Sequence, residues 1–168
     1  THHGPWLSSP SLFIEVGSTA ETWPHQGAAD LLARIIFSGL ALDGGAGFGK
    51  WDEDKNSGEL VVITLGGGHY APRGNLLGIN EGIWIGHMLA NYALPFIAPD
   101  LDGEPVMGQW KNSIDAAIKS TMKSFPGGKI IFSWDKKSFK GWQRQAIRNR
   151  AAELEIPLLN SKSILEML

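Results

Sequence analysis

The chain has 168 residues, of which 43% are hydrophobic and 19% are charged, a composition typical of a folded globular protein rather than a disordered one. It contains no cysteine, which excludes disulfides, a thiol nucleophile and thiolate metal sites. No apolar run reaches the roughly 20 residues of a membrane-spanning helix. The first residues also lack the pattern of a signal peptide, so we expect a cytoplasmic protein without a membrane partner.

The first half of the chain alternates between strand-like and helix-like patterns. Residues 11–16 are mostly apolar and predict a short internal strand. Residues 27–40 carry apolar side chains at helical spacing, whereas residues 43–58 are rich in Gly and Asp, as loops are. The clearest strand is ELVVITL at residues 59–65, which is rich in β-branched side chains and runs directly into three glycines.

The second half continues this alternation. Residues 83–94 are compatible with either a strand or a helix. Gly86 interrupts this segment and Pro95 follows its end. After them we expect helices at residues 109–124, at 138–154 and from Ser161 onward. Strands are expected between them, at residues 129–134 and 156–159. Strands that alternate with helices predict a three-layer α/β fold with a mixed, mostly parallel sheet. Because no repeat or linker divides the chain, we expect one domain over residues 1–168.

Charge is distributed unevenly along the chain. Residues 1–109 carry 4 basic and 12 acidic residues, whereas residues 110–150 carry 10 basic residues and only 2 acidic ones. Such a basic segment is typical of proteins that bind a polyanion, because phosphate contacts supply most non-specific nucleic-acid affinity. A solvated lysine-rich surface is the alternative. The candidate phosphate ligands share one face of the helix expected after Asp135: Lys137, Lys140, Arg144 and Arg148.

The segment ITLGGGHYAPR at residues 63–73 carries the strongest chemical signal. Here a predicted buried strand ends in Gly66, Gly67 and Gly68, followed by His69, Tyr70 and Arg73. In an open α/β sheet, ligands bind beyond the carboxyl ends of the strands. Successive glycines can also direct backbone N–H groups at an anion, such as a phosphate or the oxyanion of ester hydrolysis. A tight turn with a histidine on the surface is the structural alternative.

A carboxylate and several histidines are further candidates. Glu15 lies inside the predicted strand 11–16, where a buried carboxylate needs a partner. We expect it to orient a histidine or to bind an α-amino group, with an ion pair to Arg34 or Arg73 as the alternative. Any metal ion would be bound through His nitrogen or carboxylate oxygen. The candidate histidines lie beside glycine or beside another histidine: His2, His3, His69 and His87.

Five segments together resemble the D-aminoacyl-tRNA deacylases of archaea and plants. They are THHGP (1–5), FIEVGST (13–19), LGGGHYAPR (65–73), WIGHML (84–89) and KKSFKGWQRQAI (136–147). They follow one another in the family's order and span nearly the whole chain. The resemblance implies a fold related to peptidyl-tRNA hydrolase and the nucleoside phosphorylases, hydrolysis of the ester of D-aminoacyl-tRNA in chiral proofreading, and zinc as cofactor. It also implies that the family's N-terminal segment ahead of THHGP is missing here.

The resemblance assigns roles to the candidate residues. His3 and His69 would activate water, as general bases or as zinc ligands, with His2, Glu15 or His87 as a third ligand. The three glycines would donate to the oxyanion, and the basic helix would hold the acceptor stem of the tRNA. Two alternatives remain: hydrolysis of peptidyl-tRNA or another acyl ester on the same fold, and a tRNA-binding module without catalysis. No obligate protein partner is indicated.

Overall fold

A computed structural model of the chain describes residues 14–68, 70–101 and 103–168. These residues form two compact units, one up to residue 52 and the other from residue 53 onward. No helix in the described ranges is both long and apolar enough to cross a membrane.

The smaller unit contains helix α1 (Gln26–Gly39), close to the predicted 27–40. The Nδ1 atom of His25 caps this helix by accepting a hydrogen bond from the Ala28 N–H at 3.1 Å. The strand predicted at 11–16 is wrong for its described part, because residues 14–16 form no strand and Glu15 is exposed. An apolar pattern makes a strand only where a neighbour pairs with its backbone, and no described strand pairs with these residues.

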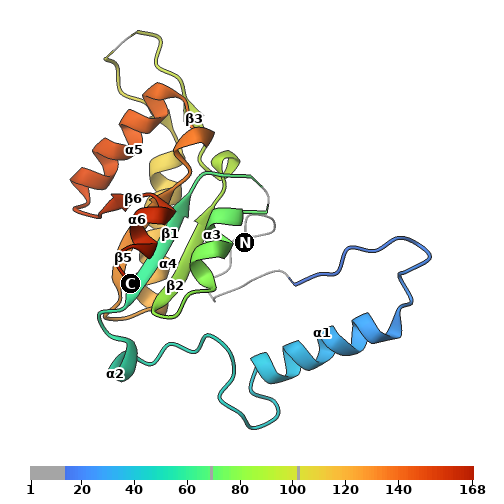
Figure 1. The fold of residues 1–168 in the computed structure, drawn as a ribbon. Coiled ribbons are helices and arrows are strands. Elements are labelled where there is room, and N and C mark those ends of the chain that lie inside the picture. Colours follow the sequence, from blue (N-terminus) through green and yellow to red (C-terminus); the bar gives the residue numbers. More distant parts are fainter. Residues whose placement is uncertain (1–13, 69, 102) are drawn as a thin grey trace. The chain divides into compact units, whose positions relative to one another are not determined.

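The larger unit is built on a four-stranded parallel sheet (Figure 1). Its strands lie in the order β2 (Ile83–Leu89), β1 (Leu60–Leu65), β5 (Lys129–Trp134) and β6 (Leu158–Leu159). The ambiguous segment at 83–94 is therefore a strand that ends at Leu89 and is followed by the 3-10 helix η1 (Asn91–Ala93). A separate antiparallel pair joins β3 (Phe96–Ile97) to β4 (Met107–Gly108).

Helices cover both faces of the sheet, which confirms the α/β prediction. Successive residues of β1 contribute to opposite faces, as the two-residue period of a strand requires. On one face, Ile63 and Leu65 belong to a hydrophobic cluster with residues of α4 (Trp110–Ser124) and α5 (Gly141–Glu153). On the other, Val62 packs with residues of α3 (Pro72–Gly78) and α6 (Ser161–Leu165). Strand β1 is almost wholly buried, as is typical of a central parallel strand.

The basic helix begins later than its sequence pattern predicts. The strand β5 leads into a short 3-10 helix, η2 (Lys136–Ser138), and α5 begins only at Gly141. The Asp135 side chain accepts a hydrogen bond from the Lys137 N–H at 3.2 Å, which favours this tight turn. Lys137 therefore lies ahead of the helix and not on its face, which corrects the prediction for that residue. Lys140 forms the N-cap, and its N–H donates to the Gln143 side chain at 2.8 Å.

The connections between strands reverse direction at the centre of the sheet. From β1 the chain passes through α3 to β2, whereas from β5 it passes through α5 to β6 at the opposite edge. Strands β1 and β5 are neighbours, but their following helices cover opposite faces. In open α/β sheets, such a reversal leaves a crevice beyond the carboxyl ends of the two strands, where ligands bind. The topology therefore places a candidate site after Leu65 and Trp134.

Candidate active site

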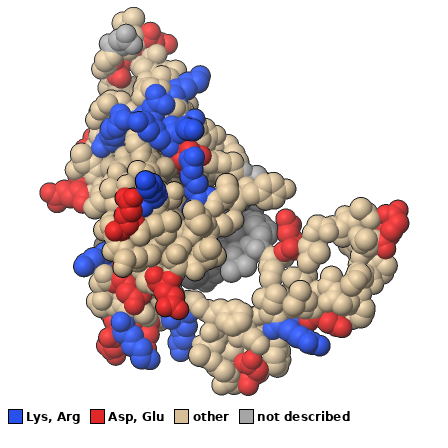
Figure 2. All heavy atoms as spheres, in the orientation of Figure 1, with Lys and Arg blue, Asp and Glu red and all other residues tan. Residues whose placement is uncertain are grey.

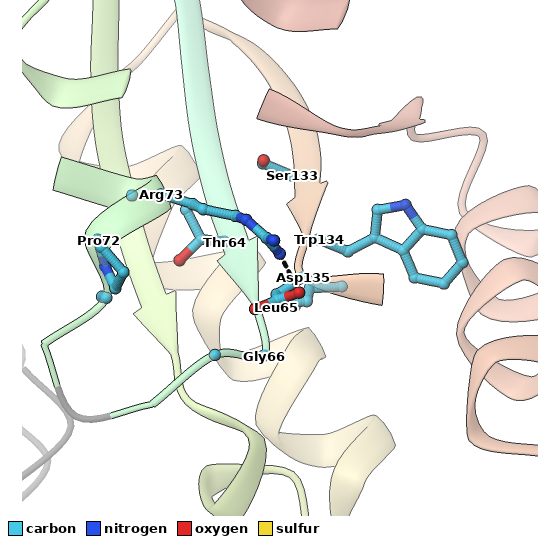
Figure 3. A pocket seen from close by; sticks show the side chains of 11 residues that line it. Thr64, Leu65, Gly66, Pro72, Arg73, Ser133, Trp134 and Asp135 are labelled. Atoms are coloured by element: carbon cyan, nitrogen blue, oxygen red, sulfur yellow. Dashed lines mark ion pairs between the residues drawn. The ribbon is translucent and has the colours of Figure 1, made fainter. Parts of the chain in front are cut away.

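A pocket lies at this reversal point (Figure 3). Its walls are the last residues of β1 and β5, the first two glycines after β1, and the start of α3. The structure thus brings Gly66, Gly67 and Arg73, all predicted site residues, to one pocket. It adds residues that the sequence did not single out, among them Thr64, Ser133 and Asp135.

The first two glycines shape the loop, and their N–H groups are already engaged. The Gly66 N–H donates to the Leu89 carbonyl at 2.7 Å, and the Gly67 N–H donates to Ser138 Oγ at 3.0 Å. Both have positive φ, +85° and +89°, a conformation that side chains disfavour. The oxyanion role predicted for these two donors is therefore not available in this conformation. For Gly68, the third, no described residue accepts its N–H.

Ser138 holds the glycine loop against the segment that follows β5. Its hydroxyl accepts from Gly67 and donates to the Asp135 carbonyl at 2.8 Å. Its own carbonyl accepts a hydrogen bond from Asn91 Nδ2 at 2.9 Å. Three segments far apart in the sequence are thus joined at one residue. No sequence signal pointed to Ser138, because its partners lie some 70 and 47 residues away along the chain.

Arg73 and Asp135 form an ion pair across the pocket. Arg73 extends from the start of α3 to the carboxylate at the end of β5, as Figure 3 shows. The Arg73 side chain is 48% exposed and that of Asp135 is 24% exposed, so both side chains can be reached from solvent. The backbone anchors Asp135, since its N–H donates to the Leu65 carbonyl at 2.8 Å. The sequence could have indicated Asp135, because it comes directly after a predicted parallel strand. Side chains at that position reach the crevice in which ligands bind.

The structure describes only part of the predicted catalytic set. His2, His3 and His69 lie outside the described residues. Tyr70 is described and is 78% exposed. Glu15 is exposed in the smaller unit, so the expectation of a buried, partnered carboxylate is wrong.

His87 is the one histidine, among those predicted to bind a metal ion, that the structure describes. It lies on β2 opposite Ile63 and is half-buried. Burial lowers the pKa of His87, which favours the neutral imidazole that binds metal ions. It is not among the residues that line the pocket at the end of β1. Within residues 14–68, 70–101 and 103–168, no three His, Asp or Glu side chains lie close enough together to hold a metal ion.

A basic surface covers η2 and α5, where Figure 2 shows Lys and Arg side chains gathered. Lys137, Lys140 and Arg148 are exposed, while Arg144 is half-buried and donates to the Phe139 carbonyl at 3.1 Å. The Arg148 guanidinium lies over the Trp134 ring, 5.3 Å from its centroid. We call the four cations Lys137, Lys140, Arg144 and Arg148 the basic row.

Arg150, on the same helix, has a different role. Its Nη2 atom donates to both carboxylate oxygens of Asp115 at 2.6 and 2.7 Å, and its Nη1 atom donates to Glu153 at 3.0 Å. The hydrogen bond to Asp115 is the main cause of its raised pKa. Arg150 therefore ties α5 to α4, and we exclude it from the phosphate-binding candidates.

Comparisons with known proteins agree with the resemblance seen in the sequence. The family model of D-aminoacyl-tRNA deacylase matches residues 1–159. The D-aminoacyl-tRNA deacylase of Arabidopsis thaliana is 44% identical over 161 residues, which cover 93% of this chain and 50% of that protein. Those of Pyrococcus abyssi and Thermococcus onnurineus are 31% and 33% identical, each over 95% of this chain and 48% of the relative. The chain thus spans about half the length of these relatives, and it belongs to the D-aminoacyl-tRNA deacylase family.

Proposed function

We propose that this protein hydrolyses the ester bond that joins a D-amino acid to the terminal ribose of tRNA. The observation that carries this proposal is the family match over residues 1–159. The pocket at the reversal point of the sheet supports it, because that position is where open α/β sheets bind ligands. A tRNA substrate also fits a cytoplasmic location.

The reaction needs an activated water and stabilisation of an oxyanion. Water attacks the ester carbonyl, and the resulting tetrahedral intermediate then expels the ribose oxygen, which takes up a proton. The products are the free D-amino acid and tRNA. His69 follows the glycine loop that lines the pocket, so we assign it the role of general base. With the N–H groups of Gly66 and Gly67 engaged, Gly68 is the remaining backbone donor that we assign to the oxyanion.

Zinc is a second way to activate the water. A bound zinc ion would lower the pKa of a coordinated water and polarise the ester carbonyl. Its ligands would be drawn from His2, His3, His69 and His87. His87 alone does not make a site, so the proposal of a zinc ion depends on the three histidines outside the described residues. No step of the reaction above depends on zinc.

The basic row is our candidate for holding the acceptor stem. Lys137, Lys140 and Arg148 are exposed, which suits contacts to phosphate oxygens. The row also lies next to the pocket in sequence and space, because Trp134 lines the pocket and carries Arg148 over its ring. A tRNA bound along the row would therefore have its 3′ end close to the pocket.

Deacylation of D-Tyr-tRNA, compared with L-Tyr-tRNA and with a peptidyl-tRNA, tests the proposal. We expect release of D-tyrosine well above the spontaneous rate and little acceleration for the L ester. Preferred cleavage of peptidyl-tRNA would favour the alternative hydrolase activity. Tight tRNA binding without acceleration of any ester would instead identify a binding module.

A further inference from the structure

The Asp135 carboxylate has one oxygen that the described residues engage and one that they leave for a ligand. Oδ1 pairs with Arg73 and accepts the Lys137 N–H. Oδ2 accepts no hydrogen bond from the residues that the structure describes, although Asp135 lines the pocket. Among the described residues, the pocket therefore contains one carboxylate oxygen with free acceptor capacity.

The glycine loop leaves a path to this oxygen. A Cβ atom built on Gly67 would lie 4.0 Å from Asp135 Oδ2, so Oδ2 faces the side of the loop that has no side chain. A Cβ atom on Gly68 would meet nothing within 4 Å among the described atoms. Figure 3 shows the Trp134 ring pointing away from Asp135, so the indole does not block this approach. A ligand group can thus reach Oδ2 across Gly67.

The charge of the pocket indicates which ligand group this is. The reacting end of an aminoacyl-tRNA carries a cationic α-ammonium group next to the ester and an anionic phosphate on the terminal nucleotide. A carboxylate binds an ammonium group more strongly than a neutral hydroxyl, because the hydrogen bond is charge-assisted at both ends. Arg73, half exposed beside Asp135, offers the opposite charge to the phosphate.

We infer that Asp135 is a specificity-determining residue that binds the free α-ammonium group of the aminoacyl ester. This inference rests on the proposed function and identifies the α-ammonium group as the part of the substrate that Asp135 binds. A peptidyl-tRNA has an uncharged amide at the same position, so Asp135 selects aminoacyl-tRNA over peptidyl-tRNA. The role is the one that the sequence suggested for Glu15, which the structure places at an exposed position of the smaller unit.

The test compares three esters that differ only at the amino group: D-Tyr-tRNA, N-methyl-D-Tyr-tRNA and N-acetyl-D-Tyr-tRNA. The methyl group keeps the positive charge, and the acetyl group removes it. We expect the wild type to cleave the first two with similar kcat/KM and the third about 10- to 100-fold less well, the range of a hydrogen bond to a charged group. Equal cleavage of all three by the wild type would overturn the inference without any variant.

The variant Asp135→Asn keeps an oxygen that can accept the Lys137 N–H but removes the charge. It should lose about 10- to 100-fold in kcat/KM on the two charged esters and little on the acetylated one. The matched control is Asp115→Asn, which removes the carboxylate that pairs with Arg150. This variant should leave the preference for the two charged esters unchanged. An equal loss on all three esters in Asp135→Asn would overturn the inference. If the wild type cleaves no ester, the proposed function itself fails, and this inference fails with it.

Discussion

Replacing Gly66 by alanine tests whether the glycine loop is held in place by close packing. A Cβ atom at this position would lie 2.3 Å from Ser138 Oγ and 2.5 Å from the Phe139 ring, far inside contact distance. The ring cannot move cheaply, because Phe139 is buried in the core. The backbone φ of +85° adds a second cost, since alanine disfavours the left-handed region.

These two costs set the size of the effect. A non-glycine residue with positive φ costs about 1–2 kcal/mol, and overpacking a core costs about 1–3 kcal/mol. We therefore expect Gly66→Ala to lower the free energy of unfolding by about 2–5 kcal/mol. With a urea m-value of about 2 kcal/mol/M, the midpoint of unfolding should fall by about 1–2.5 M. Deacylation should fall as well, because the displaced loop leads directly to residue 69.

Gly68→Ala is the matched control, because a Cβ atom there would meet no described atom within 4 Å. Its free energy of unfolding should stay within about 0.5 kcal/mol of the wild type, the usual range for an unconstrained surface change. If Gly66→Ala were equally mild, the packing of this loop against Ser138 and Phe139 would not hold in solution, and the assignment of its N–H groups would fail too.

Three further predictions concern the tRNA, the base and the metal. Lys140→Ala combined with Arg148→Ala should reduce the log–log salt slope of tRNA binding by about 1.4–1.8, since each phosphate contact contributes about 0.7–0.9. The pair Lys119→Ala and Lys123→Ala on α4 should leave the slope unchanged. An unchanged slope in both double variants would identify the basic row as a solvated face. His69→Asn should lower the single-turnover rate by about 100-fold or more with a near-normal melting temperature, whereas a lower melting temperature with normal turnover would assign this histidine to the turn alone. If zinc activates the water, chelation of protein purified without a histidine tag should abolish activity and added zinc should restore it, whereas full activity in metal-free protein would eliminate the zinc ion and leave His69 as the general base.

The elements with strong periodicity could be predicted from the sequence alone. The strands at 60–65 and 129–134 and the helices at 26–39 and 110–124 lie within one or two residues of their patterns. Each of these patterns is local, because apolar spacing follows directly from the geometry of a strand or a helix. The strand predicted at 11–16 is wrong for its described part, because a strand also needs a neighbouring strand to pair with. No local pattern can supply that partner.

The family and the location of the pocket also follow from the sequence. The five motifs identify the D-aminoacyl-tRNA deacylase family, and the glycines after β1 mark one wall of the pocket. The opposite wall could not be predicted this way. Asp135 and Ser138 reach the glycine loop only because β5 pairs with β1, and their contacts join residues some 70 positions apart.

Local sequence patterns were enough to predict the layers, the family and one strand end at which a ligand would bind. Which side chains share that strand end became known only from the packing of the whole sheet. It engaged the N–H groups of Gly66 and Gly67 inside the protein, paired Arg73 with Asp135 and left Glu15 exposed. The physical reason is that hydrogen bonds and ion pairs depend on which strands are neighbours. That choice is made by packing over the whole sheet and not by any single segment.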